Sequence, residues 1–133
     1  MSRDLSIFIQ AQTSLDVLAE ELSTLLDITW QPVQDNSHIA FRALRSDQGW
    51  ALALGTHTLQ NDGDLVFEVY PYQIDIHTIN VHDATLRESI RELGARTVFD
   101  QLKALGKYGL MLVENVQIKR DIYNPETEAH FHG

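Results

Sequence analysis

Residues 72–83, YQIDIHTINVHD, contain the point at which the chain changes from a strand pattern to a helix pattern. As far as Ile79, apolar and polar residues alternate, which is the period of a half-buried strand. Beyond Asp83, apolar residues recur every three or four positions up to Leu105, and Gly106 stands where a helix C-cap is expected. Asp83 suits an N-cap, so the stretch predicts a strand followed at once by a long helix.

Upstream of this stretch, the same alternation predicts further strands, with one helical pattern among them. We expect a helix over residues 14–26, capped by Thr13, because leucines recur there at helical spacing. Pro32 indicates that the strand containing it lies at a sheet edge or ends there. The other strands are expected over residues 4–10, 28–33, 38–45, 50–59, 65–70 and 108–118.

The expected order of elements is β-α-β-β-β-β-β-α-β. Short connections between the middle strands favour an antiparallel meander, and the two amphipathic helices would cover one face of it. The sequence thus predicts an α+β fold, a two-layer sandwich with a largely antiparallel sheet of about six or seven strands. We expect one domain over residues 1–123, followed by a polar tail over residues 124–133.

The net charge and the amino-acid composition indicate which kinds of partner and which cellular compartment to expect. The 133 residues include 19 Asp and Glu against 10 Lys and Arg, which gives a net charge of −9, and there is no cysteine. Such a field repels phosphate backbones and attracts basic proteins, so we expect a basic protein partner and no nucleic acid. The absence of cysteine fits a reducing compartment. No long apolar run or signal-peptide pattern occurs, which predicts a cytoplasmic protein with no membrane contact.

Two histidines and an aspartate raise the question of a metal or catalytic centre. On the strand over 72–79, Asp75 and His77 share one face, and His82 follows in a turn. The D-x-H pattern can supply two metal ligands or an acid–base pair, but a metal site needs three or four converging ligands. We therefore predict no cofactor and no metal, and keep a metal-binding or hydrolytic centre at Asp75, His77 and His82 as an alternative.

No nucleophile elbow and no glycine-rich phosphate loop occurs, so we predict no catalytic residues and a protein that is not an enzyme. Two tyrosines that flank Pro71 would suit an interface, because tyrosine combines a large apolar area with a hydrogen-bonding end. The predicted partner-binding residues are Glu68, Tyr70, Tyr72, Asp75, His77, Asp62 and Asp64. A further alternative is a structural or regulatory subunit that forms a homodimer through a sheet edge.

Four stretches together resemble a known class of proteins: SLDVLAEELSTLLDI (14–28), EVYPYQIDI (68–76), VFDQLKALG (98–106) and YGLMLVENVQ (108–117). In cadence and acidity, residues 13–118 look like small bacterial immunity proteins of polymorphic-toxin and contact-dependent growth-inhibition systems. The resemblance implies a stand-alone cytoplasmic protein that binds and blocks one toxin domain, commonly a basic nuclease. It implies no catalytic residues.

Overall fold

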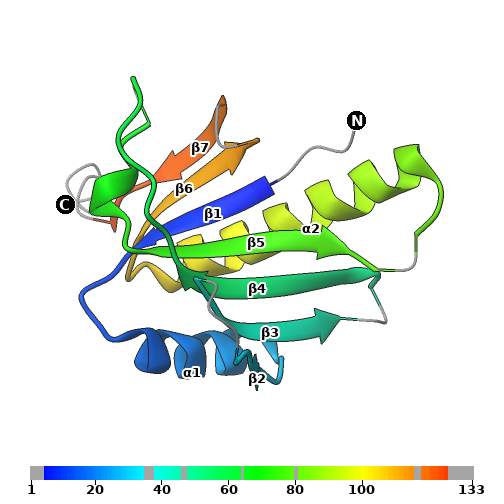
Figure 1. Ribbon diagram of the computed structural model, residues 1–133, viewed down its shortest axis with the longest axis horizontal. Helices are drawn as coiled ribbons and strands as arrows, with labels where there is room; N and C mark the ends of the chain where they lie inside the picture. Colours follow the sequence, from blue (N-terminus) through cyan, green and yellow to red (C-terminus); the bar gives the residue numbers. More distant parts are fainter. Residues whose placement is uncertain are drawn as a thin grey trace.

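A single antiparallel sheet organises the part of the chain that the structure describes (Figure 1). This computed structural model describes residues 5–34, 38–45, 48–63, 65–79, 81–115 and 118–125. Their strands are β1 (Leu5–Gln10), β2 (Gln31–Pro32), β3 (Ile39–Arg45), β4 (Trp50–Thr56), β5 (Tyr72–Thr78), β6 (Gly109–Glu114) and β7 (Ile118–Tyr123). In the sheet these seven strands take the order β2-β3-β4-β5-β1-β6-β7, and every neighbouring pair is antiparallel.

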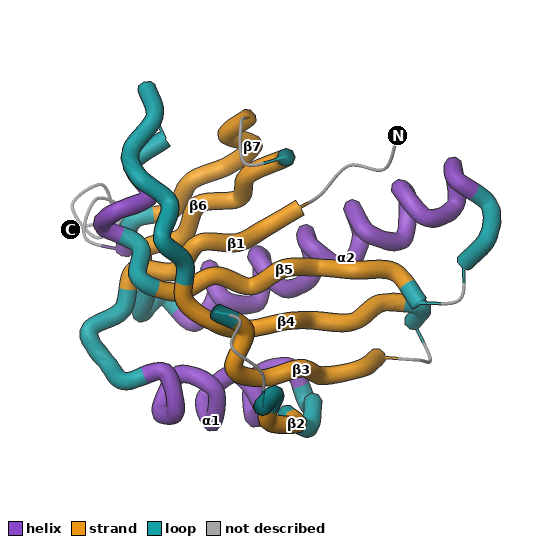
Figure 2. The backbone as a smooth tube through the Cα atoms, viewed as in Figure 1, coloured by secondary structure: helices purple, strands orange, loops and turns teal. Residues whose placement is uncertain are grey.

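The helices are α1 (Leu15–Leu26) and α2 (Ala84–Leu105), and both lie on the same side of the sheet (Figure 2). The α+β class and the antiparallel meander from β2 to β5 are therefore confirmed. β2 lies at a sheet edge, as Pro32 indicated. Neither helix in the described ranges is long and apolar enough to cross a lipid bilayer.

Local signals set the ends of both helices. The side chain of Asp83 accepts a hydrogen bond from the backbone nitrogen of Leu86 at 2.8 Å, and Gly106 closes α2 with a positive φ of 72°. These predicted caps are confirmed. For α1 the cap is Ser14, one residue later than the predicted Thr13, and its Oγ accepts from the backbone nitrogen of Val17 at 3.3 Å.

β1 and its two neighbours form the centre of the core. Alternate residues of β1 point to opposite faces, so Leu5, Ile7 and Ile9 pack under the helices while Phe8 points the other way. The helix side is filled by apolar side chains from β4, β5 and β6 together with α1 and α2. Because Ile7, Phe8 and Ile9 are all fully buried, the opposite face must also be covered around β1.

Two sequence predictions about strands are wrong. Residues 65–70 form no strand; they contain the short 3₁₀ helix η1 (Phe67–Val69) within the long connection from β4 to β5. Residues 108–118 are not one strand, because β6 ends at Glu114 and the chain turns at Asn115, where φ is 52°. It returns as β7, which pairs with β6. The observed order is therefore β-α-β-β-β-β-α-β-β.

Gly55 provides a test of the β3–β4 pairing. A Cβ on Gly55 would lie 2.0 Å from the backbone oxygen of His38, the oxygen that also accepts the Thr56 amide. We expect Gly55→Ala to lower the free energy of unfolding by roughly 2–4 kcal/mol, because backbone atoms must move. Urea unfolding measures the change.

Gly63 is the matched control for this substitution. It has a positive φ of 61° and open space around the position of a Cβ. Gly63→Ala therefore adds only backbone strain, and we expect a loss of about 1 kcal/mol. Equal losses in the two variants would contradict the close approach at Gly55.

Candidate binding surface

The connection between β4 and β5, residues 57–71, covers the sheet face opposite the helices. Leu65, Phe67 and Tyr70 of the connection pack with Phe8 of β1 and with two residues of β6 in a second hydrophobic cluster. The β6 residues are Met111 and Val113. In Figure 1 the connection crosses in front of the sheet on the side away from α2, and part of it rises beyond the strands. Because one side of the connection packs against the sheet, the opposite side of the connection faces solvent.

His57 fastens the start of the connection to its end. Its Nδ1 accepts a hydrogen bond from the backbone nitrogen of Leu59 at 3.0 Å, and its Nε2 lies 2.5 Å from the backbone oxygen of Tyr70. These two partners require a neutral ring that carries its proton on Nε2. The ring also meets Phe8 edge to face, with centroids 5.1 Å apart. His57 thus joins both ends of the connection and the central strand.

The middle of the connection is closed by its own hydrogen bonds. Asp62 and Leu65 exchange two backbone hydrogen bonds of 2.9 Å, and the backbone nitrogen of Glu68 donates to Oδ1 of Asn61 at 2.9 Å. Gly63 supplies the positive φ that this turn needs. The connection is therefore shaped before any partner arrives.

Acidic and apolar side chains alternate on the solvent side of this shaped segment. Asp62 and Glu68 are exposed, as the sequence indicated. Val66 is 40% exposed and Val69 is 47% exposed, so each valine leaves apolar surface in contact with solvent. We call Asp62, Val66, Glu68 and Val69 the acidic ridge. Asp64, also a predicted partner residue, lies outside the described residues.

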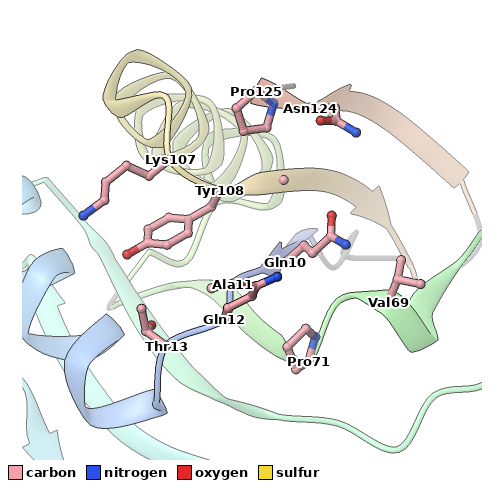
Figure 3. Close-up of a pocket in the computed structure, with 11 residues that line it drawn as sticks. Gln10, Ala11, Gln12, Thr13, Val69, Pro71, Lys107, Tyr108, Asn124 and Pro125 are labelled. Atoms are coloured by element: carbon pink, nitrogen blue, oxygen red, sulfur yellow. The ribbon is translucent and has the colours of Figure 1, made fainter. Parts of the chain in front are cut away.

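A hollow of about 740 Å³ lies beside the acidic ridge. Figure 3 shows Val69 and Pro71 on one side of this hollow and Asn124 and Pro125 on the other, with Gln10 between them. The full lining is Gln10, Ala11, Gln12, Thr13, Val69, Pro71, Lys107, Tyr108, Gly109, Asn124 and Pro125. Because these residues come from four separate parts of the chain, no sequence pattern marks the hollow.

Tyr108 forms the buried end of the hollow. Burial raises the pKa of Tyr108 to about 12, and the neighbouring carboxylate of Glu21 adds to the rise. Glu21 in turn accepts an ion-pair hydrogen bond from Nζ of Lys107 at 3.0 Å. Tyr108 therefore stays a neutral phenol at physiological pH.

The two predicted tyrosine anchors are placed differently from the expectation. Tyr70 is only 7% exposed and belongs to the second hydrophobic cluster, and burial raises its pKa. The hydroxyl of Tyr72 donates to the backbone oxygen of Thr13 at 2.5 Å, which ties β5 to the entrance of α1. Both tyrosines thus make internal contacts, and only Tyr72 is partly exposed, so its contact with a partner stays a prediction.

Asp75 forms hydrogen bonds within the sheet. Its Oδ1 accepts from Oγ of Ser6 at 2.6 Å and from Nε2 of Gln73 at 2.7 Å, on the face away from the helices. His77 lies exposed further along the same strand face, and His82 is exposed before α2. Within the described ranges no three His, Asp or Glu side chains are grouped so that they could hold a metal ion. The structure does not bring Asp75, His77 and His82 together as such a group.

Glu68 was expected on a strand over residues 65–70, and this is corrected. It lies in η1, within the connection, and not on a strand. The alternation matches burial over residues 65–68, where Leu65 and Phe67 are buried while Val66 and Glu68 are exposed, but it fails at the exposed Val69 and the buried Tyr70.

The charged residues are unevenly distributed along the chain, which the net charge alone does not show. Residues 4–86 contain twelve Asp and Glu but only two basic residues, Arg42 and Arg45. Residues 87–133 contain seven residues of each sign. Among the described carboxylates of residues 4–86 only Asp75 lies in a strand, while Glu20 on α1 and Asp62 and Glu68 on the connection are exposed. The negative charge of the sequence is therefore concentrated in residues 4–86, which include the acidic ridge.

Comparison with known proteins adds no further information: no family model matches the chain, and neither a curated protein nor a solved structure matches it.

The role of His57 can be tested by His57→Leu. This change leaves the Leu59 amide and the Tyr70 carbonyl without their ring partner, and we expect the free energy of unfolding to fall by about 1–3 kcal/mol. Amide hydrogen exchange at Leu59 should also accelerate. His77→Leu, the same change on an exposed ring, should alter stability by less than about 0.5 kcal/mol. If both variants behave alike, His57 does not hold the connection.

Tyr108 predicts a loss of stability in alkali. The unfolded chain releases the Tyr108 proton near the ordinary pKa of 10.0, whereas the folded protein holds it to about 12. The unfolded state therefore binds fewer protons in this interval, and the free energy of unfolding should fall as pH rises from 10 to 12. Urea unfolding at stepped pH measures the slope. Tyr108→Phe should reduce it, and a slope unchanged in that variant would contradict the assignment.

Proposed function

We propose that the protein is a non-enzymatic binding module that acts in the cytoplasm, where it binds and neutralises a basic protein. The expected partner is a toxin domain of the nuclease type. The observation that carries the proposal is the concentration of negative charge in residues 4–86. The exposed residues of the acidic ridge belong to this part of the chain. The resemblance of EVYPYQIDI (68–76) and three other stretches to immunity proteins points to the same class of partner.

Electrostatics would act first, at the encounter. A field of net negative charge draws a basic partner toward the protein and raises the association rate by up to a few orders of magnitude at low salt. Nucleases that cleave nucleic acids present basic surfaces to phosphate. An acidic protein surface can occupy such a site, and Asp62 and Glu68 are exposed carboxylates on a segment that projects from the sheet.

Apolar contact and shape would then hold the complex. Val66 and Val69 stand between the carboxylates, so that a partner can bury them once it has docked. The hydrogen bonds of His57, Asn61 and Asp62 fix the connection in advance, which reduces the ordering entropy lost on binding. The adjacent hollow gives space for a side chain or a turn that protrudes from the partner.

The test combines growth and binding measurements. The protein is co-expressed with the C-terminal domain of the polypeptide encoded next to its gene, and cell growth reports neutralisation. With purified partner, Asp62→Lys and Glu68→Lys should each slow association about fivefold to tenfold at low salt, and the difference should shrink as salt rises. Biolayer interferometry at several salt concentrations measures both rates.

Asp100→Lys is the matched control, since it makes the same change of charge at an exposed position of α2, in the part of the chain with balanced charge. It should slow association by less than about twofold. A neighbouring domain that is not toxic, or that is toxic but neither bound nor neutralised, would refute the proposal. If Asp100→Lys and Glu68→Lys slow association equally, the acidic ridge is not the binding surface.

A further inference from the structure

A second concave surface lies on the helix layer, separate from the hollow. Val17 and Leu25 of α1 and Leu105 in the last turn of α2 form an apolar floor, and the groove between the two helices has a volume of about 410 Å³. Its remaining lining residues are Glu20, Glu21 and Thr24. Val17 is 49% exposed, although it stands on the same helix as the buried Leu18 and Leu22. We call this surface the α1 groove.

The geometry of the α1 groove suits another helix. Val17, Glu21 and Leu25 are spaced four residues apart, so they form one ridge along α1, and Glu20 and Thr24 form the row beside it. Leu105 closes the groove from the second helix. Two neighbouring helices that leave an apolar furrow between them can accept a third amphipathic helix, which places its own apolar row in the furrow.

The rim of the groove determines the charge of its occupant. α1 contains three acidic residues and no Lys or Arg. Glu21 is already paired with Lys107 at 3.0 Å, whereas no ion pair within the described residues engages the exposed carboxylate of Glu20. A basic side chain on the incoming helix would find Glu20 at the edge of the apolar floor. The groove thus offers an apolar floor for contact and, at its rim, the negative charge of Glu20.

A second copy of the chain is a poor occupant of this groove. It would bring the same α1 carboxylates against Glu20 and Glu21, and close like charges oppose association. A basic segment of a different protein meets no such repulsion, because the two charge patterns are complementary.

We propose that the α1 groove docks an amphipathic, basic helix of a partner protein, with apolar side chains on Val17, Leu25 and Leu105 and a Lys or Arg at Glu20. This site shares no lining residue with the hollow beside the acidic ridge. It is therefore a second interaction surface, and it stands or falls separately from the toxin-binding function proposed above.

A model peptide tests the groove without knowledge of the natural partner. The probe is a fluorescein-labelled leucine–lysine peptide of about 14 residues, roughly four helical turns, with its leucines on one face. A second peptide keeps every lysine and replaces each leucine by serine. Fluorescence anisotropy should show binding of the first peptide at least about fivefold tighter than of the second, because only the first can fill the apolar floor.

Two substitutions in the groove have comparable counterparts on α2, outside both proposed surfaces. Val17→Ser and Glu20→Gln should each weaken binding of the leucine–lysine peptide about threefold to tenfold. Leu93→Ser and Asp100→Asn make similar changes at other exposed positions and should leave the dissociation constant within about twofold. All four positions are exposed, and circular dichroism confirms that each variant keeps its fold.

Backbone amide shifts in two-dimensional NMR locate the peptide directly, and the largest changes are expected at Val17, Thr24 and Leu105. Three results would overturn the proposal: no binding of the leucine–lysine peptide, equal binding of the serine–lysine peptide, or equal weakening by the groove variants and the Leu93 and Asp100 variants. The last two would identify diffuse attraction to an acidic protein. None of these results depends on whether a toxin domain is neutralised.

Discussion

The insertion of β1 between β5 and β6 is the constraint on which the rest of the structure depends. The first strand of the chain pairs with Tyr72–Ile76 of β5 on one side and with Gly109–Glu114 of β6 on the other. A strand in the middle of a sheet has two faces to cover, and the helices cover only one. Phe8 points to the other face, so a second layer is required there. The β4–β5 connection supplies that layer, and its outer side becomes the acidic ridge.

The parts of the fold that follow from local sequence could be predicted. The caps of α2 at Asp83 and Gly106 act within a few residues, and the strands from Ile39 to Thr56 show their period over a short distance. Residues 65–70 show where periodicity fails. Leu65 and Phe67 are buried and Val66 and Glu68 exposed, as in a strand, but the backbone has no neighbouring strand and forms a 3₁₀ turn. The alternation therefore predicted burial as far as Glu68, failed at Val69 and Tyr70, and wrongly predicted strand hydrogen bonding.

β7 escaped prediction for a related reason. Its sequence, IKRDIY, is polar, and its charged residues are satisfied by elements far away in the chain. Arg120 pairs with Glu92 of α2 and with Glu114 of β6, and Asp121 pairs with Arg96 of α2 at 2.7 Å. These pairs hold the edge strand under the helix. A periodicity of apolar residues cannot reveal a strand whose inward side chains are ion pairs.

In the candidate site, too, local signals predicted some residues correctly, whereas contacts between distant parts of the sequence determine the rest. Exposure of Asp62 and Glu68 follows from a turn signal and from charge, both of which are local. The burial of Tyr70 follows from the cluster around Phe8 and Met111, which are distant in sequence, so local sequence could not indicate it. The same holds for Asp75, whose hydrogen-bond partner Ser6 lies 69 residues away. An aspartate near two histidines suggested a metal site. In the structure, the Asp75 carboxylate instead accepts a hydrogen bond from the hydroxyl of Ser6 on the neighbouring strand β1.

The separation of charge explains why one molecule can present two acidic surfaces. In residues 87–133 the cations are used in internal pairs, such as Arg96 with Asp121 and Arg120 with Glu92. In residues 4–86, one of the two arginines, Arg45, binds the carbonyl end of α1 through Leu26 and Asp27. Few cations remain to neutralise the carboxylates of the acidic ridge and of α1. Their fields add over distances comparable to the Debye length, so both surfaces favour basic partners, while the exposed valines make each contact local.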